Sequence, residues 1–237
     1  YGDTYNYFVG NPRLFPQLTD NYEVAHSFMD GTLITTLNYS RISNLIANYA
    51  LQQSSDTSLV QFMGPVNLPL MENFGISSSL YLPVKKWWTN QLFVNAYYNK
   101  LSGNYSGVEL DKQQLAVTAN ATQTFTLPAE WGVELSALYI SPTLESYTVN
   151  KSMGMLSAGV QKQVWGLKGT FKLAVQDAFY TFQFRGTTNA VGINNNYVYR
   201  WDNRIVTFSF TYKFGTTRFI NNDDKKIDEN AGKKGFR

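Results

Sequence analysis

Cysteine is absent from this 237-residue chain, and charged residues are scarce. Without cysteine the chain can form neither a disulfide framework nor a thiolate metal site. Charged residues make up 16% of the sequence, whereas soluble domains usually carry about 25%. A chain so poor in charge has few groups with which to coat a water-facing surface. The net charge is only +3 and six of the twenty basic residues lie in the last 22 positions, so no nucleic-acid footprint is visible and we expect no nucleic-acid partner.

Long apolar runs and signal sequences are missing as well. No run approaches the roughly 18 residues expected of a membrane-spanning helix. The first residues do not show a basic segment followed by an apolar one, the pattern of a secretory signal. We therefore expect either that a signal was removed or that the sequence is an internal piece of a longer protein.

Catalytic and metal-binding patterns are also lacking. His26 is the only histidine, so neither a catalytic triad nor a histidine metal site has its partners. No phosphate-binding glycine loop occurs, and the segment 223–229 lacks the glycine and alternating oxygen ligands of a calcium loop. Carboxylates such as Glu72, Glu134 and Asp177 are scattered singly. We expect a protein that is not an enzyme and that uses no cofactor and no metal.

What the chain does contain is strict alternation of apolar and small polar residues. Near the C-terminus Val206, Phe208, Phe210, Tyr212 and Phe214 alternate with Thr207, Ser209, Thr211 and Lys213. Period-two patterns of this kind predict β-strands. About nine such segments follow one another, at 22–28, 33–49, 74–83, 92–98, 115–127, 133–139, 156–164, 171–175 and 206–214.

The connections between these segments alternate in length. Short turns are expected at 30–31, 84–88, 128–132 and 165–166. Longer polar links are expected near 52–57, 102–110, 142–150 and 184–196. Short turns at one end and long loops at the other predict an antiparallel up-and-down transmembrane β-barrel whose two ends face different compartments.

The polar positions indicate what each face of the sheet meets. They are mostly Thr, Ser, Asn, Gln and Gly, which suit a wet barrel interior better than a solvated outer surface. The membrane-facing set is expected to include Leu115, Val117, Phe171, Leu173, Val206, Phe208, Phe210, Tyr212 and Phe214. Four tryptophans near the short turns are expected to form an interface girdle, namely Trp87, Trp88, Trp131 and Trp165. A soluble β-sandwich, with these aromatics in its core, remains an alternative.

Three stretches resemble a known family. They are Gly10-Asn11-Pro12-Arg13-Leu14-Phe15-Pro16 with the following Asn21-Tyr22-Glu23-Val24, the segment 175–180, and the terminal strand 204–215. Together, over about residues 5–215, they resemble the Bacteroidetes-type outer-membrane β-barrel family related to TonB-dependent receptors. The resemblance implies a 22-stranded barrel with an N-terminal plug, of which this chain would be the C-terminal portion. A small closed barrel, with a tenth strand supplied by the first residues, is the alternative. It divides the chain into an extracellular loop segment (1–18), barrel strands (19–215) and a charged, flexible periplasmic tail (216–237).

The resemblance implies import across the outer membrane of a Gram-negative bacterium. Expected partners are outer-membrane lipid, the TonB energy-coupling protein through a plug outside this chain, the barrel-assembly machinery through the last strand, and a surface lipoprotein or other protein. Candidate ligand contacts are expected in the long loops and the upper lumen of the barrel, at Asn194, Asn195, Tyr197, Tyr199, Arg200 and Trp201. The ending expected of the glycan-importer branch is missing, so siderophore, peptide, metal complex and sugar all remain open as solutes. An adhesion or assembly platform and a soluble binding module are the alternative functions.

Overall fold

The computed structural model describes residues 6–53, 61–190 and 193–215, and these residues form strands and connections without any helix. None of the described residues therefore belongs to a helix able to cross a membrane. The strands are β1 (Asn6–Phe8), β2 (Leu18–Phe28), β3 (Leu33–Gln53), β4 (Gln61–Lys85), β5 (Trp88–Tyr105), β6 (Val108–Leu127), β7 (Trp131–Ile140), β8 (Thr143–Glu145), β9 (Thr148–Asn150), β10 (Met153–Val164), β11 (Gly169–Gln176), β12 (Phe184–Ala190), β13 (Ile193–Tyr199) and β14 (Ile205–Tyr212).

Nine of these strands form one large antiparallel sheet, which we call the main sheet. Its order is β14-β11-β10-β7-β6-β5-β4-β3-β2, and the short β1 pairs with β4 in parallel. Four further strands, in the order β13-β12-β9-β8, form a second sheet, which we call the upper sheet. Each strand of the upper sheet continues or precedes a main-sheet strand, since β7 leads into β8, β9 into β10, β11 into β12, and β13 into β14. The chain thus makes nine up-and-down passes, and the all-β antiparallel fold predicted from the alternation is confirmed.

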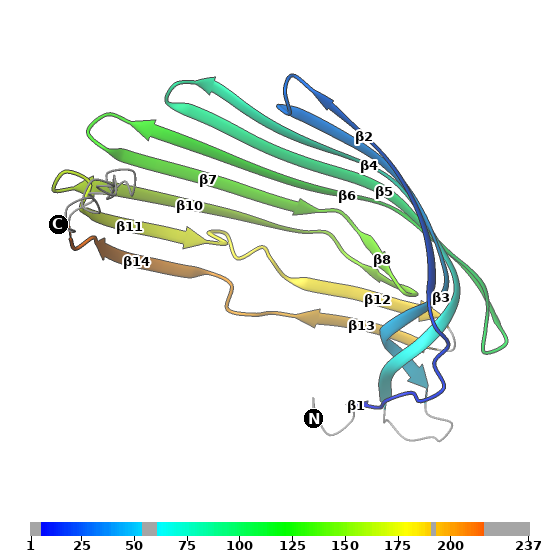
Figure 1. The fold of residues 1–237 in the computed structure, drawn as a ribbon. Coiled ribbons are helices and arrows are strands. Elements are labelled where there is room, and N and C mark those ends of the chain that lie inside the picture. Colours follow the sequence, from blue (N-terminus) through cyan, green and yellow to red (C-terminus); the bar gives the residue numbers. More distant parts are fainter. Residues whose placement is uncertain (1–5, 54–60, 191–192, 216–237) are drawn as a thin grey trace, which may run out of the picture.

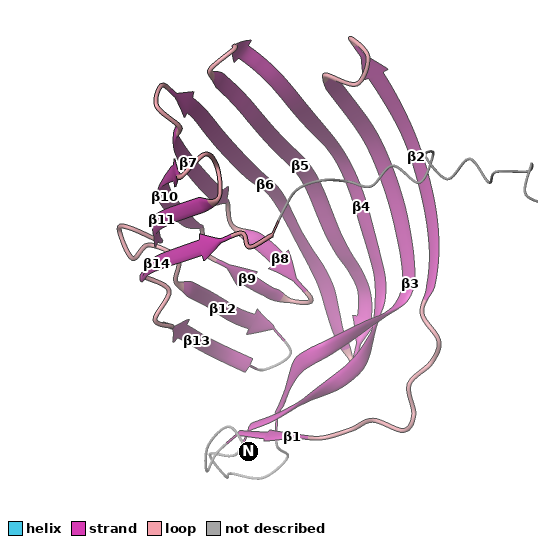
Figure 2. Cartoon of the chain, turned by 60° about the vertical axis from the view of Figure 1, so that its left-hand side comes forward, coloured by secondary structure: helices cyan, strands magenta, loops and turns pink. Residues whose placement is uncertain are grey.

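The main sheet bends into an open trough (Figures 1 and 2). Its two outermost strands are β2 and β14, and neither has a second neighbour among the described residues. The sheet therefore does not close into a barrel within the part of the chain that the structure describes. The upper sheet lies at one end of the trough, where β8 contacts β6 and β13 contacts β3 (Figure 2).

The tight turns at one end of the sheet match the short connections read from the sequence. Residues 29–32, 86–87, 128–130 and 165–168 join consecutive strands there. The first of these turns places Met29 and Asp30 at φ 51° and Gly31 at φ 88°. Aspartate and glycine accept this left-handed conformation, which lets a short hairpin follow the twist of its strands. We call this end of the sheet the tight-turn end.

The predicted long links at the opposite end are wrong in part. The segment 102–110 is not a loop, because β5 runs to Tyr105 and β6 begins at Val108, with only Ser106 and Gly107 between them. Likewise, 142–150 contains the β8–β9 hairpin and 184–196 contains the β12–β13 hairpin. Hydropathy misses these strands because they are rich in Asn, Thr and Ser, residues that sequence reading assigns to loops. The link near 52–57 lies largely outside the described residues.

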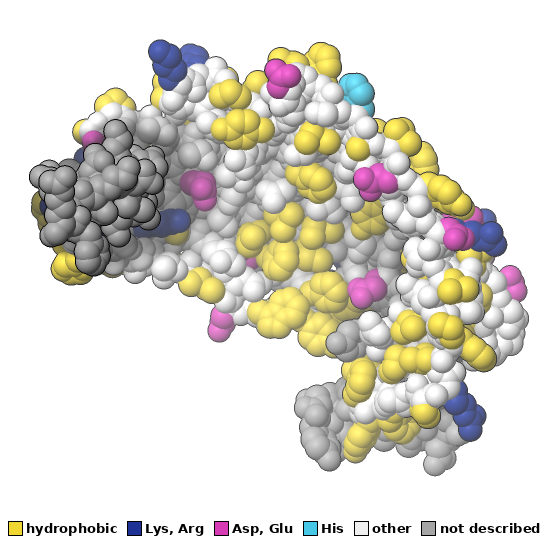
Figure 3. All heavy atoms as spheres, in the orientation of Figure 1, with side chains coloured by type: hydrophobic (Ala, Val, Ile, Leu, Met, Phe, Trp, Pro, Cys, Tyr) yellow, Lys and Arg dark blue, Asp and Glu magenta, His cyan; other side chains and the backbone are white. Residues whose placement is uncertain are grey.

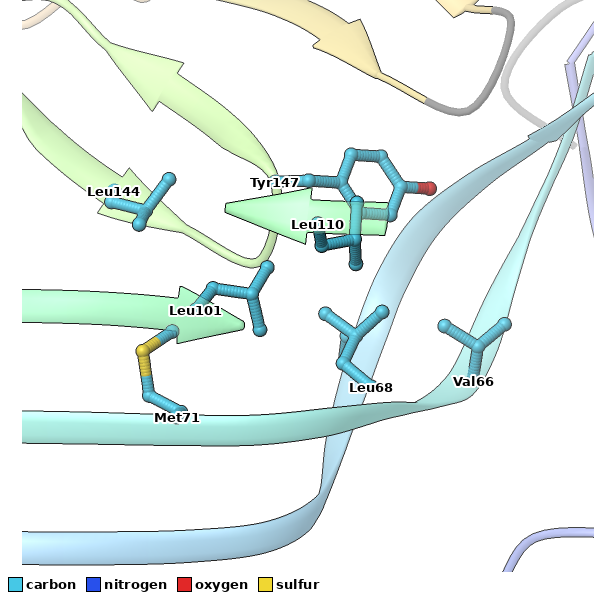
Figure 4. Packing of buried hydrophobic residues seen from close by; sticks show 8 residues of the cluster. Val66, Leu68, Met71, Leu101, Leu110, Leu144 and Tyr147 are labelled. Carbon is cyan, nitrogen blue, oxygen red and sulfur yellow. The ribbon is translucent and has the colours of Figure 1, made fainter. Parts of the chain in front are cut away.

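The buried core lies where β3 and β4 leave the main sheet. Pairing of β4 with β5 ends at Leu70 and Ser102, whereas pairing of β3 with β4 continues to Gln53 and Gln61. We call this extension (43–53 with 61–70) the β3–β4 ribbon. The space between the ribbon, the β5–β6 hairpin and the β8–β9 hairpin is filled by one hydrophobic cluster (Figure 4), which comprises Ala47, Val66, Leu68, Met71, Leu101, Leu110, Leu144 and Tyr147.

The segment 9–17, which carries the first family-like motif, is tied to the ribbon by hydrogen bonds. The amide of Asn67 accepts from the Phe15 N–H (2.8 Å) and donates to the carbonyl oxygens of Phe15 (3.0 Å) and Asn44 (2.9 Å). Asn11 also donates to the Pro65 carbonyl over 3.1 Å. Within the segment 1–18, expected as loop, Asn6–Phe8 forms the short strand β1. The motif thus fixes the entry into the sheet, while the tail 216–237 lies outside the described residues.

Candidate functional site

One face of the main sheet carries a mostly apolar surface. Cross-strand pairs place Leu173 opposite Phe208 and Phe171 opposite Phe210, whose ring centroids are 4.8 Å apart. Val206 and Phe208 expose 69% and 68% of their surface. All the residues expected to face the membrane on β6, β11 and β14 share this face by register, and Phe214 follows the end of β14. We call this the outer face.

The opposite face is lined by small polar side chains, and we call it the inner face. An amide ladder crosses it, because Asn38 donates to the Oδ1 of Asn73 over 2.9 Å and Asn73 donates to the Oδ1 of Asn99 over 2.5 Å. On the C-terminal strands, Thr170, Lys172, Thr207 and Ser209 occupy the same face by alternation. These residues offer hydrogen bonds but little apolar surface.

Aromatic rings cluster on the outer face at the tight-turn end. Trp87, Trp88 and Phe125 stack with centroid distances of 6.1 to 6.3 Å. The indole of Trp165 makes edge contacts with the rings of Phe171, Phe210 and Tyr212. Lys162 lies 5.3 Å from the ring centroid of Trp131. The four tryptophans predicted as a girdle therefore lie along one end of the sheet.

A charged row crosses the outer face farther from the turns, and sequence reading missed it. Asp20 pairs with Arg41, Arg41 with Glu72, and Glu72 with Lys100 across four consecutive strands. The hydroxyl of Tyr39 donates to Glu72 Oε1 over 2.9 Å. Each strand contributes one charged residue at an otherwise apolar position, so the row is visible only once the register is known. The apolar surface is bounded by tryptophans at one end and by charges at the other.

A cavity of about 940 Å³ lies between the inner side of β3–β5 and the upper sheet. Ser40, Asn73 and Asn99 line it from the main sheet, while the β8–β9 turn and the β12–β13 hairpin line it from the other side. We call this space the chamber. Hydrophobic side chains gather on the face of the molecule where β12 and β13 cross it (Figure 3).

Four aromatic rings form a strip on the β12–β13 hairpin and its continuation. Phe184 lies 5.8 Å from Tyr197, Tyr197 lies 5.4 Å from Tyr199, and Tyr199 stacks on Trp201 at 6.3 Å with an interplanar angle of 15°. Phe184 also lies 6.4 Å from Trp201, which closes the group. Phe184, Tyr197 and Tyr199 line the chamber. We call these four residues the aromatic strip.

The structure separates the six candidate ligand contacts into two groups. Asn195, Tyr197 and Tyr199 line the chamber, and Trp201 extends the strip by stacking on Tyr199. Asn194 and Arg200 are exposed and are not among the residues that line the chamber. Sequence reading missed the lining residues Phe184, Tyr147, Glu145, Asn73 and Asn99, because distant strands bring them together.

The wall of the chamber is held by hydrogen bonds inside the upper sheet. Tyr197 donates to the buried Oδ1 of Asn150 over 2.5 Å, and the hydroxyls of Thr148 and Thr188 lie 2.7 Å apart. Burial, with Glu145 and Tyr199 nearby, raises the pKa of Tyr197 to about 12. Burial, with Tyr105 nearby, also raises the pKa of Tyr147. Both phenols are therefore uncharged at physiological pH.

The link between β11 and β12 is fixed by Asp177, which is fully buried. Its Oδ1 accepts from the backbone N–H of Thr181 (2.9 Å) and from the Thr181 hydroxyl (3.3 Å), and its Oδ2 accepts from the backbone N–H of Phe182 (3.1 Å). The family-like segment 175–180 thus contains the residue that turns the chain from the main sheet toward the upper sheet.

Within residues 6–53, 61–190 and 193–215, no group of three His, Cys, Asp or Glu side chains could hold a metal ion.

A family model described as "Outer membrane protein beta-barrel family" matches residues 1–212. No curated protein and no solved structure matches the chain.

Proposed function

The chain belongs to the outer membrane protein beta-barrel family and is an outer-membrane protein, and from this premise we propose that it forms part of the wall of a TonB-dependent receptor. Such a receptor imports a solute through a barrel closed by a plug, and the energy-coupling protein TonB releases the solute into the periplasm. Membership of this family replaces the alternative of a soluble β-sandwich.

The observation that carries the proposal is the chamber on the polar, inner side of a sheet whose other face is apolar. Lipid accepts strands only when their backbone groups are paired, and such barrels alternate apolar residues outside with polar residues inside. A ligand chamber on the inner side lies on the path that an imported solute takes. An adhesion or assembly platform would instead expose its binding surface outward.

The membrane position follows from the length of the apolar surface. Trp88 and Tyr98 lie ten positions apart on β5, which corresponds to about 33 Å along the strand at ~3.3 Å per residue. At a tilt of about 40°, this length spans a height of about 25 Å, the size of a barrel's apolar band. We place the tryptophans at the periplasmic interface and the charged row from Asp20 to Lys100 at the outer one.

The other proposed partners follow from this placement. The outer face contacts lipid, the upper sheet and chamber face the cell exterior, and β14 is the strand that the assembly machinery reads. The plug, the remaining strands of a 22-stranded barrel and the contact with TonB are contributed outside this chain. A surface lipoprotein would dock on the exterior side of the upper sheet.

Growth experiments test the import function. A strain lacking the full-length gene and a strain lacking TonB are grown on a panel of single nutrient sources, together with the complemented strains. If the protein is an importer, at least one nutrient should support growth of neither deletion strain, and the intact gene should restore growth on it. If the gene deletion grows normally on every nutrient that requires TonB but loses surface attachment or a surface complex, the platform function replaces import.

A further inference from the structure

We infer that the chamber binds an uncharged, hydroxyl-rich ring solute, an oligosaccharide, through the aromatic strip. This inference rests on the proposed import function and names the class of solute that the chamber accepts. It follows from the shape of the strip, the free polar groups of the lining and the charge of the chamber.

The aromatic strip gathers the rings of Phe184, Tyr197, Tyr199 and Trp201 into one group beside the chamber. The near-parallel pair Tyr199 and Trp201 and the neighbouring Tyr197 present π-faces over consecutive centroid separations of 5.4 and 6.3 Å. The face of an aromatic ring carries partial negative charge. The C–H groups on one side of a sugar ring carry partial positive charge, so they pack on such faces. A row of rings suits a chain of sugar units.

Polar groups with spare hydrogen-bonding capacity surround the strip. The side-chain amide of Asn195 and the Tyr199 hydroxyl make no hydrogen bond to the described residues, and the Nδ2 of Asn99 is likewise unused by them. These amides and hydroxyls both donate and accept, as the hydroxyl groups of a sugar require. Tyr197, by contrast, is held by Asn150 and contributes its ring. Bonding groups therefore lie both beside the aromatic strip, on β13, and on the main-sheet wall across the chamber.

The charge of the chamber selects against anions. Glu145 is the only lining residue with a formal charge among those the structure describes, and the lining includes no lysine or arginine. A carboxylate, phosphate or sulfate in the solute would meet one negative group and no cation, which disfavours its binding. The Oε2 of Glu145 already accepts a hydrogen bond from Asn150 at 3.3 Å. A single exposed carboxylate should contribute less to ligand binding than the amide groups and aromatic rings do.

The size of the chamber favours an oligomer over a single sugar. Its volume of about 940 Å³ lies at the upper end of the roughly 300–1,000 Å³ that small-molecule sites occupy. The strip continues past the lining to Trp201, which is 52% exposed. A longer chain of sugars can thus extend from the chamber onto this ring.

The test uses the full-length protein, purified in a detergent without a sugar headgroup, on an array of neutral, anionic and cationic oligosaccharides. The wild type is expected to retain neutral glycans and to discriminate against uronate and sulfated forms of the same length. Titration with the best neutral glycan then compares Tyr199→Ala with Val198→Ala, which lies on the opposite face of β13. Tyr199→Ala is expected to lower affinity by about ten-fold or more, and Val198→Ala by less than about two-fold.

The inference is overturned if no neutral glycan binds, if charged forms bind more tightly, or if both variants lose affinity equally. Tyr199→Ala removes a side chain that is half exposed and not hydrogen-bonded, so it tests binding without disturbing the wall. The experiments distinguish a failure of the proposed import function from a failure of the proposed solute class. Glycan binding with TonB-independent growth would refute the import function alone, whereas TonB-dependent growth on a nutrient other than a glycan, without glycan binding, would refute the solute class alone.

Discussion

The strands β13 and β14 are two halves of one passage of the chain, yet they carry aromatic residues on opposite faces. On β14, Phe208 and Phe210 point to the outer face and Thr207 and Ser209 to the inner face. On β13 the rings of Tyr197 and Tyr199 face the chamber, while Asn194 and Asn196 alternate with them.

The same exchange occurs between β11 and β12. Phe171 and Leu173 lie on the outer face of β11, whereas Phe184 of β12 lines the chamber. Alternation is constant along both passages, but the solvent on each side changes. In the proposed placement, lipid contacts the outer face of the main sheet and water surrounds the upper sheet, so the aromatic rings of the upper sheet can face the interior. The exchange of faces would then mark where the chain leaves the membrane.

The largest effect should come from breaking the outer face of β14. Phe208→Arg places a charge in the apolar band, where arginine near the midplane costs about 2–4 kcal/mol. Ser209→Arg, one position away on the inner face, should cost far less. Unfolding by urea in lipid vesicles, followed by the gel shift between folded and unfolded barrel, measures both. Equal losses for the two variants would contradict the assignment of the faces.

The next largest effect should come from the link between β11 and β12, which joins the main sheet to the upper sheet. Asp177→Ala leaves the N–H groups of Thr181 and Phe182 without their carboxylate acceptor, and we expect a local loss of about 3 kcal/mol. Hydrogen exchange over residues 177–183 measures the loss. Asp177→Asn should recover part of the protection, and the exposed Asp202→Ala should leave it unchanged. Full protection in Asp177→Ala would show that the carboxylate does not hold the turn.

A smaller effect should come from displacing the Tyr197 side chain within the aromatic strip. A Cβ at Gly186 would lie 2.3 Å from the hydroxyl oxygen of Tyr197, so Gly186→Ala forces the phenol away from Asn150 at a cost of about 2 kcal/mol. The protein should stay folded while glycan affinity falls. Gly10→Ala, in the segment 9–17, meets no atom within 4 Å and serves as the control for affinity. Unchanged affinity in Gly186→Ala would mean that the position of Tyr197 does not matter.

The smallest effect concerns the tyrosine hydroxyl and its titration. Tyr197→Phe removes the hydrogen bond to Asn150 and should cost about 1 kcal/mol. Because the pKa of Tyr197 is raised to about 12, the folded state holds its proton more tightly than the unfolded state. Stability from this group is therefore complete below pH ~10 and falls as the pH rises toward 12. Ultraviolet titration at high pH should lose one late-ionising step in Tyr197→Phe, whereas the step of Tyr147, whose pKa burial raises further, should remain. An unchanged titration in Tyr197→Phe would contradict the raised pKa of Tyr197.

The sequence was sufficient to predict the nine passages, because period-two patterns such as 206–214 are local. Aromatic character in a polar segment marks Tyr197 and Tyr199 as candidates, and both line the chamber, while their contact with a ligand stays a prediction. The sequence could not provide the chamber, since Asn73, Asn99 and Phe184 meet only through the register and bend of distant strands. The charged row from Asp20 to Lys100 stayed hidden for the same reason. The strands inside 102–110 and 142–150 were missed because strands with water on both sides lack apolar alternation.

The exposed two-residue turn at Ser106 and Gly107 gives a direct handle on topology in living cells. Every thiol introduced into this cysteine-free chain is unique within it, so Ser106→Cys and Lys86→Cys put reporters at opposite ends of the β5 strand. A maleimide dye that cannot cross the outer membrane would stain the first and spare the second. The position that is labelled shows which end of β5 faces the cell exterior.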